Sequence, residues 1–312
     1  MMKAIILKEF GSADQLQIQE LEIPAVKEQE VLIRVKAISI NPVDIKTREC
    51  KGAAGKIGEE RPIILGWDIS GIVTESRSER FKVGNEVFGM VNFPGHGKAY
   101  AEYVSAPADQ LVLKPASISH IDAAAATLAA LTAWQALVTN AKIKAGDRVL
   151  IHAAAGGVGN YAVQIAKHLG AYVIGTSSGA KKDFVLSLGA DEHIDYTAVP
   201  FEQATRDIDF VLDTIGGDNI DRSLKVIKKG GTIISIPSGF REMVAEKTKD
   251  SGINGYFIMV QSDGQDMQQI ARLLENGQLK SHVSQVFDFE DMIIAHKALE
   301  TGRTQGKIVV RL

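Results

Sequence analysis

Cysteine is almost absent from the chain, since Cys50 is the only one among 312 residues. A single cysteine excludes an intramolecular disulfide and a zinc cage built from several thiolates. It also favours a reducing compartment, in which disulfides are not maintained. We expect the Cys50 thiol to be buried and inert, because free cysteines behave mostly as small apolar groups.

Long apolar runs and basic tracts are also missing. The most apolar segment, residues 123–138, falls short of the ~20 residues that cross a bilayer and is typical of a buried helix. The first residues, MMKAIILKEFGSAD, lack the apolar core of a signal peptide. With a net charge of −3 and no basic tract, the chain carries no electrostatic footprint for nucleic acid. We therefore expect a cytoplasmic protein with neither a nucleic-acid nor a membrane partner.

The residues that are present indicate a globular protein with two domains. Hydrophobic residues make up 45% of the chain and charged residues 23%, and the length exceeds that of one ordinary core. The first ~120 residues favour an all-β unit. Strands are predicted at 3–10, 16–24 and 30–40, because each stretch mixes alternation with β-branched residues and ends at a turn signal.

From residue 121 the pattern changes to alternating helices and strands. A helix is predicted over 121–138, with Ser119 or Asp122 as its N-cap. The following alternation favours parallel βαβ units. Its strands are predicted at 147–154, 171–177, 192–196, 207–216 and 231–238, and its helices at 158–170, 180–189 and 221–230. A helix at 266–279 and strands at 282–289 and 306–312 do not extend the series.

A glycine cluster lies between the first of these strands and the helix that follows it. The stretch AAGGVG, residues 154–159, matches G-x-G-x-x-G except that Ala154 holds the first position. Gly156 would let the backbone approach a pyrophosphate, and Gly159 would allow close packing of helix on strand. Free N–H groups at a helix start bind anions. The position between strand and helix favours dinucleotide binding over a purely structural turn, with contacts from Ala155, Gly156, Gly157, Val158 and Gly159.

The residues after the second strand indicate which nucleotide is bound. NAD sites place Asp or Glu about 20 residues after the glycines, but this chain has GTSSGAKK there. Ser177, Ser178 and Lys181 would suit a 2′-phosphate, because its charge needs cations and hydrogen-bond donors. Tyr196, which ends the short third strand, is expected beside the same pocket. We predict NADPH rather than NADH, with the alternative that Lys181 and Lys182 are a solvated helix start.

The chain resembles the zinc-independent quinone oxidoreductases of the medium-chain dehydrogenase/reductase superfamily along nearly its whole length. Within the superfamily, Asn41-Pro42-Val43-Asp44 followed by Lys46 is most similar to the quinone and enone oxidoreductases. The stretches that carry the resemblance are VKAISINPVDIKTR (35–48), ILGWDISGIV (64–73), KVGNEVFG (82–89), AYAEYV (99–104), AAATLAALTAWQAL (124–137), GDRVLIHAAAGGVG (146–159), LDTIGG (212–217), GGTIIS (230–235) and QGKIVV (305–310).

The resemblance implies an α/β fold of two domains, with the active site in the cleft between them. A GroES-like β-barrel catalytic domain would span 1–122 and be completed by 262–312. A Rossmann domain with a doubly wound parallel sheet would span 123–261 and bind NADP. The family also implies a homodimer or a homotetramer.

The resemblance further implies that no metal is used. Zinc-dependent relatives carry a cysteine where this chain has Asn41, and a His-Glu pair where it has Trp67-Asp68. Catalytic zinc needs three protein ligands and an open position. His96 is the only histidine in the first ~115 residues and is more typical of a loop than of a ligand set. We predict chemistry without zinc.

Asn41 and Lys46 are the candidate catalytic residues by this resemblance. Without a metal, the protein must work by positioning and hydrogen bonding. Asn41 and Pro42 would lie near the nicotinamide, and Lys46 near its ribose or the acceptor. The alternatives are that Asn41 is a turn former or helix cap and that Lys46 is a surface lysine. Asp44 is expected to cap or orient its neighbours.

The remaining cofactor contacts also come from the resemblance. Thr132 would contact the nicotinamide or the phosphates, although a helix-interior threonine can instead bond back to its own backbone. The loop after the fifth Rossmann strand would meet the nicotinamide amide through Ile236, Pro237 and Ser238. Arg303 would approach the adenosine phosphate, although its local pattern departs from the family's by about a residue.

These expectations favour an NADPH-dependent oxidoreductase that reduces a small-molecule quinone or enone by direct hydride transfer. One alternative is a detoxifying reductase of alkenal or enone double bonds, which would differ only in pocket side chains. Another is a weakly catalytic NADPH-binding interaction protein. Fold analogy alone does not name the acceptor.

Overall fold

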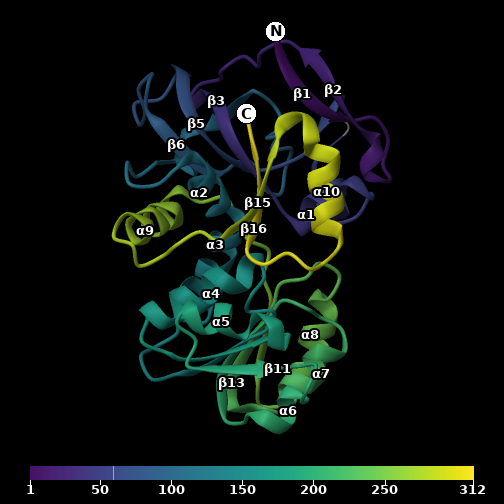
Figure 1. Ribbon diagram of the computed structural model, residues 1–312, viewed down its shortest axis with the longest axis vertical. Helices are drawn as coiled ribbons and strands as arrows, with labels where there is room; N and C mark the ends of the chain where they lie inside the picture. Colours follow the sequence, from purple (N-terminus) through teal and green to yellow (C-terminus); the bar gives the residue numbers. More distant parts are fainter. Residues whose placement is uncertain (59) are drawn as a thin grey trace. The chain divides into compact units, whose positions relative to one another are not determined.

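The computed structural model describes residues 1–58 and 60–312 (Figure 1). The chain forms two compact units, one from residues 1–131 and 261–312 and the other from residues 132–260. The predicted domain bounds, 1–122 with 262–312 and 123–261, differ from these units only at residues 123–131 and 261. Residues 123–131 join the first unit, because Ala124 and Ala125 pack against Ala37 and Val309 of its sheet. Within the described residues no helix has the length and apolar character needed to cross a membrane.

The first unit is built from strands, with helices packed on them. Its main sheet has the order β15-β16-β3-β5-β6-β8, with β7 paired to β3, and a smaller sheet has the order β2-β1-β4. The strands are β1 (Met2–Leu7), β2 (Leu16–Leu21), β3 (Glu30–Ile40), β4 (Ile63–Ile64), β5 (Asp68–Ser76), β6 (Glu86–Met90), β7 (Tyr103–Pro107), β8 (Val112–Leu113), β15 (Val283–Asp288) and β16 (Lys307–Arg311). The helices are α1 (Pro42–Arg48), α2 (His120–Ala125), α9 (Gly264–Glu275) and α10 (Met292–Glu300).

The last strand, β16, returns to the N-terminal sheet and lies beside β3 (Figure 1). The pairing is antiparallel, with Ile308 opposite Ile40 and Val309 opposite Ser39. One step further along this register, Lys307 meets Asn41, the residue that directly follows β3. The register of one strand pair therefore joins residues that are 266 positions apart in the sequence.

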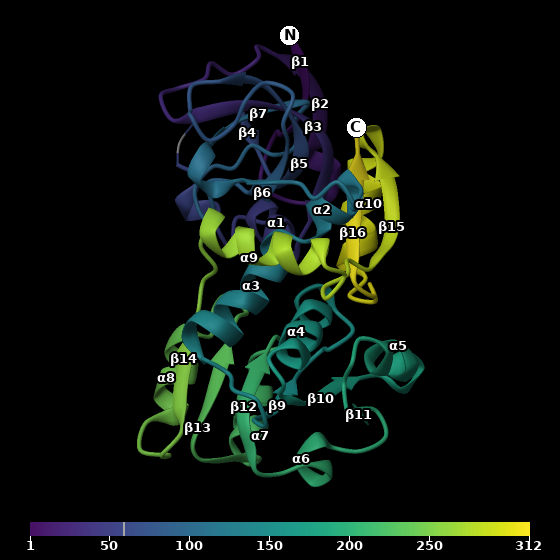
Figure 2. The same ribbon diagram turned by 90° about the vertical axis from the view of Figure 1, so that its left-hand side faces the viewer.

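The second unit is a parallel sheet in the order β11-β10-β9-β12-β13-β14. Neighbouring strands run in the same direction, as the arrows in Figure 2 show. This order is that of a doubly wound dinucleotide-binding sheet. The strands are β9 (Arg148–Ile151), β10 (Tyr172–Ser177), β11 (Glu192–Asp195), β12 (Ile208–Asp213), β13 (Ile227–Ser235) and β14 (Asn254–Phe257). The helices are α4 (Gly157–His168), α5 (Lys182–Ser187), α6 (Phe201–Ala204), α7 (Asp218–Leu224) and α8 (Arg241–Thr248), and α3 (Leu128–Trp134) crosses the boundary.

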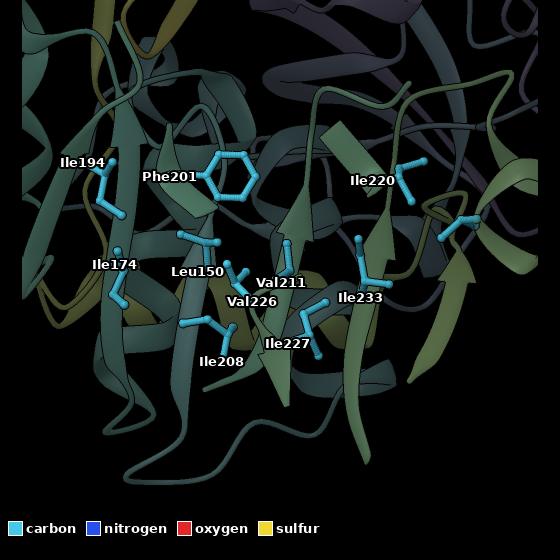
Figure 3. Close-up of a cluster of buried hydrophobic side chains, with 11 residues drawn as sticks. Leu150, Ile174, Ile194, Phe201, Ile208, Val211, Ile220, Val226, Ile227 and Ile233 are labelled. Atoms are coloured by element: carbon cyan, nitrogen blue, oxygen red, sulfur yellow. The ribbon is translucent and has the colours of Figure 1, made fainter. Parts of the chain in front are cut away.

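The core of the second unit lies on its sheet (Figure 3). Leu150, Ile174, Val211 and Ile233 come from four adjacent strands and are fully buried. Phe201 of α6 packs on the same cluster. Strands that are buried on both faces need near-continuous apolar runs, and RVLI and IDFVLD supply them.

The helix predicted over 121–138 is interrupted. Ser119 is the N-cap, since its side chain accepts a hydrogen bond from the Asp122 N–H at 3.1 Å. The first helix, α2, ends at Ala125, and α3 starts again at Leu128. The buried carboxylate of Asp68 accepts the Leu128 N–H at 3.0 Å and supplies a new helix start.

Two further sequence predictions are wrong. The helix expected over 221–230 ends at Leu224, because Ile227 pairs with Ile208 and begins β13. The Cys50 thiol is exposed rather than buried. Cys50 follows α1 with a φ of 62°, a left-handed conformation that ends the helix and directs the chain away from it.

Candidate functional site

The glycine turn of the second unit joins β9 to α4. Gly156 is the N-cap residue of α4, and its N–H donates to the Ala153 carbonyl at 2.8 Å. A Cβ atom at position 159 would lie 2.2 Å from the Ala153 oxygen, so only glycine fits there. At position 156 the same test gives 3.1 Å, so that a methyl group needs only a small adjustment. The tight approach brings the first turn of α4 against the end of β9.

The same turn has the features of an anion site. The first N–H groups of a helix have no partner within the helix, and the helix dipole favours negative charge beside them. Asn160 Nδ2 donates to the carbonyls of Gly156 and Gly157, at 2.9 and 2.7 Å, and so fixes the first peptide groups of α4. Asn160 Oδ1 is buried and accepts no hydrogen bond within the described residues. Asn160 was not among the predicted site residues.

The ends of β10 and β11 carry the four residues predicted for a 2′-phosphate. The Lys181 N–H donates to the Ser178 carbonyl at 2.9 Å, and the Tyr196 N–H donates to the Ser177 carbonyl at 3.2 Å. Ser177 is buried, and its Oγ lies 2.8 Å from His193 Nε2. The Tyr196 side chain is 54% exposed. The backbones of these four residues therefore lie close together at the ends of β10 and β11, and their contact with a 2′-phosphate stays a prediction.

A carboxylate also lies at this strand end, and the sequence analysis missed it. Asp195 is the register partner of Ser177. Its Oδ1 accepts from the Thr197 N–H at 2.9 Å and from the Thr197 hydroxyl at 2.6 Å, and these bonds hold the pKa of Asp195 below its usual value. A Cβ atom at Gly179 would lie 2.4 Å from Asp195 Oδ2. The signal was present in HIDY, but only its tyrosine was considered.

The loop Ile236-Pro237-Ser238 is positioned by a buried aspartate. Asp213 ends β12, and its carboxylate accepts from the Gly216 N–H at 3.0 Å and from the Ser235 hydroxyl at 2.7 Å. The Ile236 N–H donates to the Asp213 carbonyl at 3.0 Å. Asp213 therefore joins the loops that follow β12 and β13 at the carboxyl edge of the sheet, where open parallel sheets bind ligands. Asp213 lies in LDTIGG (212–217), one of the stretches that resemble the superfamily, but this positioning role was not predicted.

His152 follows β9 and is buried among hydroxyls. Its Nδ1 lies 3.1 Å from Thr176 Oγ1 and its Nε2 lies 3.0 Å from Ser223 Oγ. Burial lowers the pKa of His152 to about 4. The imidazole is therefore neutral at pH 7 and serves to join β9, β10 and α7.

In the first unit, Asn41 is the N-cap of α1 and Pro42 is its first residue. The Asp44 carboxylate accepts the Asn41 N–H at 2.6 Å, as the expected capping role requires. The side-chain amide of Asn41 is also engaged. Its Oδ1 accepts a hydrogen bond from Lys307 Nζ, and its Nδ2 donates to Asp68 Oδ2 at 2.8 Å. Asn41, Asp44, Asp68 and Lys307 are all buried, whereas Pro42 is exposed.

Asp44 also belongs to a chain of buried polar groups. Arg48 Nη1 lies 3.1 Å from His296 Nδ1, and the Tyr100 hydroxyl lies 3.0 Å from His296 Nε2. Arginine can only donate, so His296 Nδ1 accepts and the ring proton is on Nε2. Nε2 then donates to the Tyr100 oxygen, and Tyr100 is in turn one of the groups that act on the pKa of Asp44.

The protonation of these groups follows from their burial. Burial, reinforced by Arg48, lowers the pKa of His296 to about 3. Burial also raises the pKa of the Asp44 carboxyl to about 8, although the Asn41 N–H opposes the rise. His296 is therefore neutral at pH 7, and the Asp44 carboxyl holds its proton far more readily than an exposed aspartate.

The other predicted residues lie in different surroundings. Lys46, on α1, is half-buried, and burial lowers its pKa with a smaller contribution from Lys51. Thr132 is buried in α3. Arg303 is exposed in the loop before β16, where its N–H donates to the Thr301 hydroxyl at 3.3 Å. Thr132 belongs to the second unit, and Asn41, Pro42, Lys46 and Arg303 belong to the first.

The positions that match zinc ligands in relatives do not fit a zinc ion. Asn41 offers an amide oxygen that already accepts from Lys307. The indole of Trp67 has no lone pair for a metal, and its N–H donates to the Gly95 carbonyl at 2.7 Å. The Asp68 carboxylate accepts from Asn41 and Leu128. Among residues 1–58 and 60–312, no three His, Cys, Asp or Glu side chains gather as metal ligands.

Comparisons with known proteins match both parts of the chain. Residues 27–116 match the alcohol dehydrogenase GroES-like domain family, and residues 188–310 match the zinc-binding dehydrogenase family. The chain is 34% identical to the chloroplastic NADPH-dependent alkenal/one oxidoreductase of Arabidopsis thaliana, over 99% of this chain and 79% of that protein. It is 30% identical to the quinone oxidoreductase of Sus scrofa, over 100% of this chain and 98% of the relative.

A solved structure is similar over the full length. The quinone oxidoreductase from Coxiella burnetii is 36% identical, with a TM-score of 0.95 and coverage of 100% of this chain and 99% of the other. The fold expected from the sequence, a GroES-like domain with a parallel-sheet Rossmann domain, is confirmed. The chain belongs to the medium-chain dehydrogenase/reductase superfamily and, within it, to the quinone oxidoreductase branch.

Proposed function

We propose that the protein is an NADPH-dependent reductase of quinones or α,β-unsaturated carbonyl compounds that works without zinc. The observation that carries the proposal is the turn at the start of α4. There, Gly159 packs against the Ala153 carbonyl and the first N–H groups of a twelve-residue helix lie at the carboxyl end of β9. This arrangement suits a pyrophosphate.

The residues of the second unit fit a dinucleotide with a 2′-phosphate. Ala155, Gly156, Gly157, Val158 and Gly159 would hold the pyrophosphate, helped by the unpartnered Oδ1 of Asn160 as acceptor for a ribose hydroxyl or a water. Ser178, Lys181 and Tyr196 would hold the 2′-phosphate, with Ser177 beneath them. Thr132, Ile236, Pro237 and Ser238 would contact the nicotinamide half. Arg303, Asn41 and Pro42 are the proposed contacts from the first unit.

Asp195 is the feature that opposes 2′-phosphate binding, because two anions at one strand end repel each other. Its Oδ1 is bonded to Thr197 and its Oδ2 lies against Gly179. These contacts reduce the capacity of the carboxylate to accept from a ribose hydroxyl. The hydroxyls and the lysine at the same strand end therefore support NADPH over NADH.

The residues of the first unit are proposed to stabilise the charge that develops on the acceptor and to supply a proton. Bound NADPH supplies a hydride to an electron-poor carbon of the acceptor, and negative charge then develops on the carbonyl oxygen. A donor beside that oxygen lowers the barrier. Lys46 is the proposed donor, since burial lowers its pKa and so eases proton release from Nζ. Asn41 Nδ2, whose second hydrogen makes only a long contact to the Ser39 carbonyl with an N···O distance of 3.5 Å, is the other proposed donor.

The names of the relatives support this acceptor class. One is described as an alkenal/one oxidoreductase that depends on NADPH, and others are described as quinone oxidoreductases. Both acceptor types contain a carbonyl conjugated to an electron-poor carbon, and neither needs a metal to polarise it. A saturated ketone has no carbon conjugated to its carbonyl and therefore serves as a matched negative control.

The experiment is a steady-state assay of purified protein with NADPH or NADH in the presence of a chelator. The acceptors are a 1,4-quinone, a linear enone and the saturated ketone of the same carbon skeleton. We expect chelator-resistant oxidation of NADPH with quinone or enone and none with the ketone. Turnover of the ketone, or loss of activity with the chelator, contradicts the proposal. Tight NADPH binding without turnover on any acceptor identifies a binding protein instead.

A further inference from the structure

Lys307 is a buried lysine that the proposed mechanism does not use. Its side chain is 3% exposed, and its Nζ donates to the Ile40 carbonyl at 3.1 Å and to Asn41 Oδ1. Buried lysines are rare because removing an ammonium group from water is costly. Burial lowers the pKa of Lys307, and the charges of Asp68 and Asp44 oppose that change.

The carboxylates around Lys307 belong to the same cluster. Asp68 is fully buried, and burial raises its pKa while Lys307 lowers it. Asp44, on α1, is the other acidic group that acts on Lys307. Ionisable groups that are buried together are often no better for stability than apolar side chains of similar volume. Stability alone therefore does not explain why Lys307, Asp68 and Asp44 are buried together.

The hydrogen bonds of the cluster define the orientation of one amide. An asparagine side chain can rotate by 180° with little change in shape, which exchanges its donor and its acceptor. Lys307 Nζ can only donate, so it fixes the position of Asn41 Oδ1. Asp68 Oδ2 accepts from Asn41 Nδ2 at 2.8 Å, so it fixes the position of that nitrogen. Lys307 and Asp68 therefore select one of the two amide orientations.

We propose that Lys307 and Asp68 are positioning residues that clamp the side-chain amide of Asn41 for the reduction. Asn41 and Asp68 occupy positions where zinc-dependent relatives carry metal ligands, and the cation that they face here is the ammonium group of Lys307. The inference rests on the proposed function for its kinetic consequence. Its structural content, the fixed orientation of Asn41, is independent of the acceptor.

The test compares the wild-type protein with Lys307→Met, which keeps the length of the side chain and removes its charge and donors. Lys82→Met is the matched control, because Lys82 is exposed in the first unit and its substitution removes the same charge. Three quantities are measured: kcat and KM for the acceptor, the dissociation constant of NADPH, and the NMR signal of the Asn41 side-chain amide. Selective ¹⁵N-asparagine labelling isolates that signal, and its loss in Asn41→Asp assigns it.

We expect Lys307→Met to lower kcat by about 10²-fold, since small misplacements of a positioning group cost this much. The KM for the acceptor and the dissociation constant of NADPH should change less than about threefold, and the amide signal of Asn41 should shift. Lys82→Met should change none of these quantities. A folded Lys307→Met protein with kcat within about threefold of the wild-type value, or with an unmoved Asn41 signal, overturns the inference.

Two results separate this inference from the proposed function. If the wild-type protein turns over no acceptor, the proposed function fails, and the Asn41 signal alone decides whether Lys307 clamps the amide. If Lys307→Met does not fold, Lys307→Arg takes its place, since it keeps the charge and changes only the donor geometry. A shifted Asn41 signal in Lys307→Arg with a reduced kcat supports the clamp, and an unmoved signal contradicts it.

Discussion

At the scale of single residues, the proposed choice between NADPH and NADH depends on a few side chains after β10. Lys181 is the cation nearest in sequence to Ser177 and Ser178, and Asp195 places an opposing charge at the neighbouring strand end. A 2′-phosphate gains charge-assisted hydrogen bonds from the lysine and repulsion from the aspartate. The balance between the attraction by Lys181 and the repulsion by Asp195 should therefore determine the preference for NADPH over NADH.

Lys181→Ala tests that balance. The variant should raise the KM for NADPH by about tenfold or more, because one charge-assisted hydrogen bond contributes roughly 1.5–3 kcal/mol. The KM for NADH should remain within about twofold, since NADH has no phosphate for Lys181 to bind. Steady-state kinetics with both cofactors measure the two values. Equal losses with NADPH and NADH would show that Lys181 does not contact the 2′-phosphate.

At the scale of elements, the turn between β9 and α4 combines two glycines with different requirements. Gly159 is needed by the fold, because a Cβ atom there would collide with the Ala153 carbonyl at 2.2 Å. Gly156 has an extended backbone with a φ of −81°, and a Cβ atom there would meet the same carbonyl at 3.1 Å. A substitution at position 159 should therefore affect folding, and a substitution at position 156 should affect mainly cofactor binding.

Gly156→Ala and Gly159→Ala form a matched pair of variants. Gly156→Ala should stay within about 1 kcal/mol of wild-type stability while binding NADPH at least about tenfold more weakly, because its methyl group occupies the path of the pyrophosphate. Gly159→Ala should lose about 2 kcal/mol or more, as overpacking does. Urea unfolding and NADPH titration measure both effects. Unchanged binding in Gly156→Ala would argue against a pyrophosphate at this turn.

The elements differ in how far the sequence predicts them. Most strands of the second unit and α4 follow from local signals, since continuous apolar runs and a glycine turn are visible within short windows. The start of β13 and the whole of β14 were not predicted. The break between α2 and α3 does not, because the group that restarts the helix at Leu128 is the carboxylate of Asp68, 60 residues away. Likewise, GKIVV predicts a strand, but only its pairing with β3 brings Lys307 to Asn41.

At the scale of the whole molecule, each unit contains a buried neutral histidine. The pKa of His152 falls to about 4 and that of His296 to about 3. A histidine with a lowered folded pKa contributes stability above its unfolded pKa, near 6.5, and that contribution is lost as the pH falls towards the folded value. In the first unit Asp44 has the opposite effect on the pH dependence of stability. Because its pKa is raised to about 8, its contribution to the free energy of unfolding is lost as the pH rises from about 4 to about 8. The second unit is therefore the clearer test.

His152→Asn should make the second unit less stable at pH 7 and less sensitive to acid. Between pH 7 and pH 5 the stability gap between the wild type and the variant should narrow by up to about 2 kcal/mol, the linkage of one proton over about 1.5 pH units. Hydrogen exchange of β9 and β12 amides measures the free energy of opening in both proteins. A gap that stays constant across this range would mean that His152 does not remain neutral in the folded protein.

Direct transfer of hydrogen from NADPH to the acceptor carbon is the central claim of this account. The measurement that tests it most directly uses NADPH deuterated at C4 of the nicotinamide, one stereoisomer at a time, with an enone and chelator-treated protein. Mass spectrometry and NMR of the product then locate the label. We predict deuterium at the former β-carbon of the enone from one stereoisomer only. A reduced product without label from either stereoisomer would contradict the account.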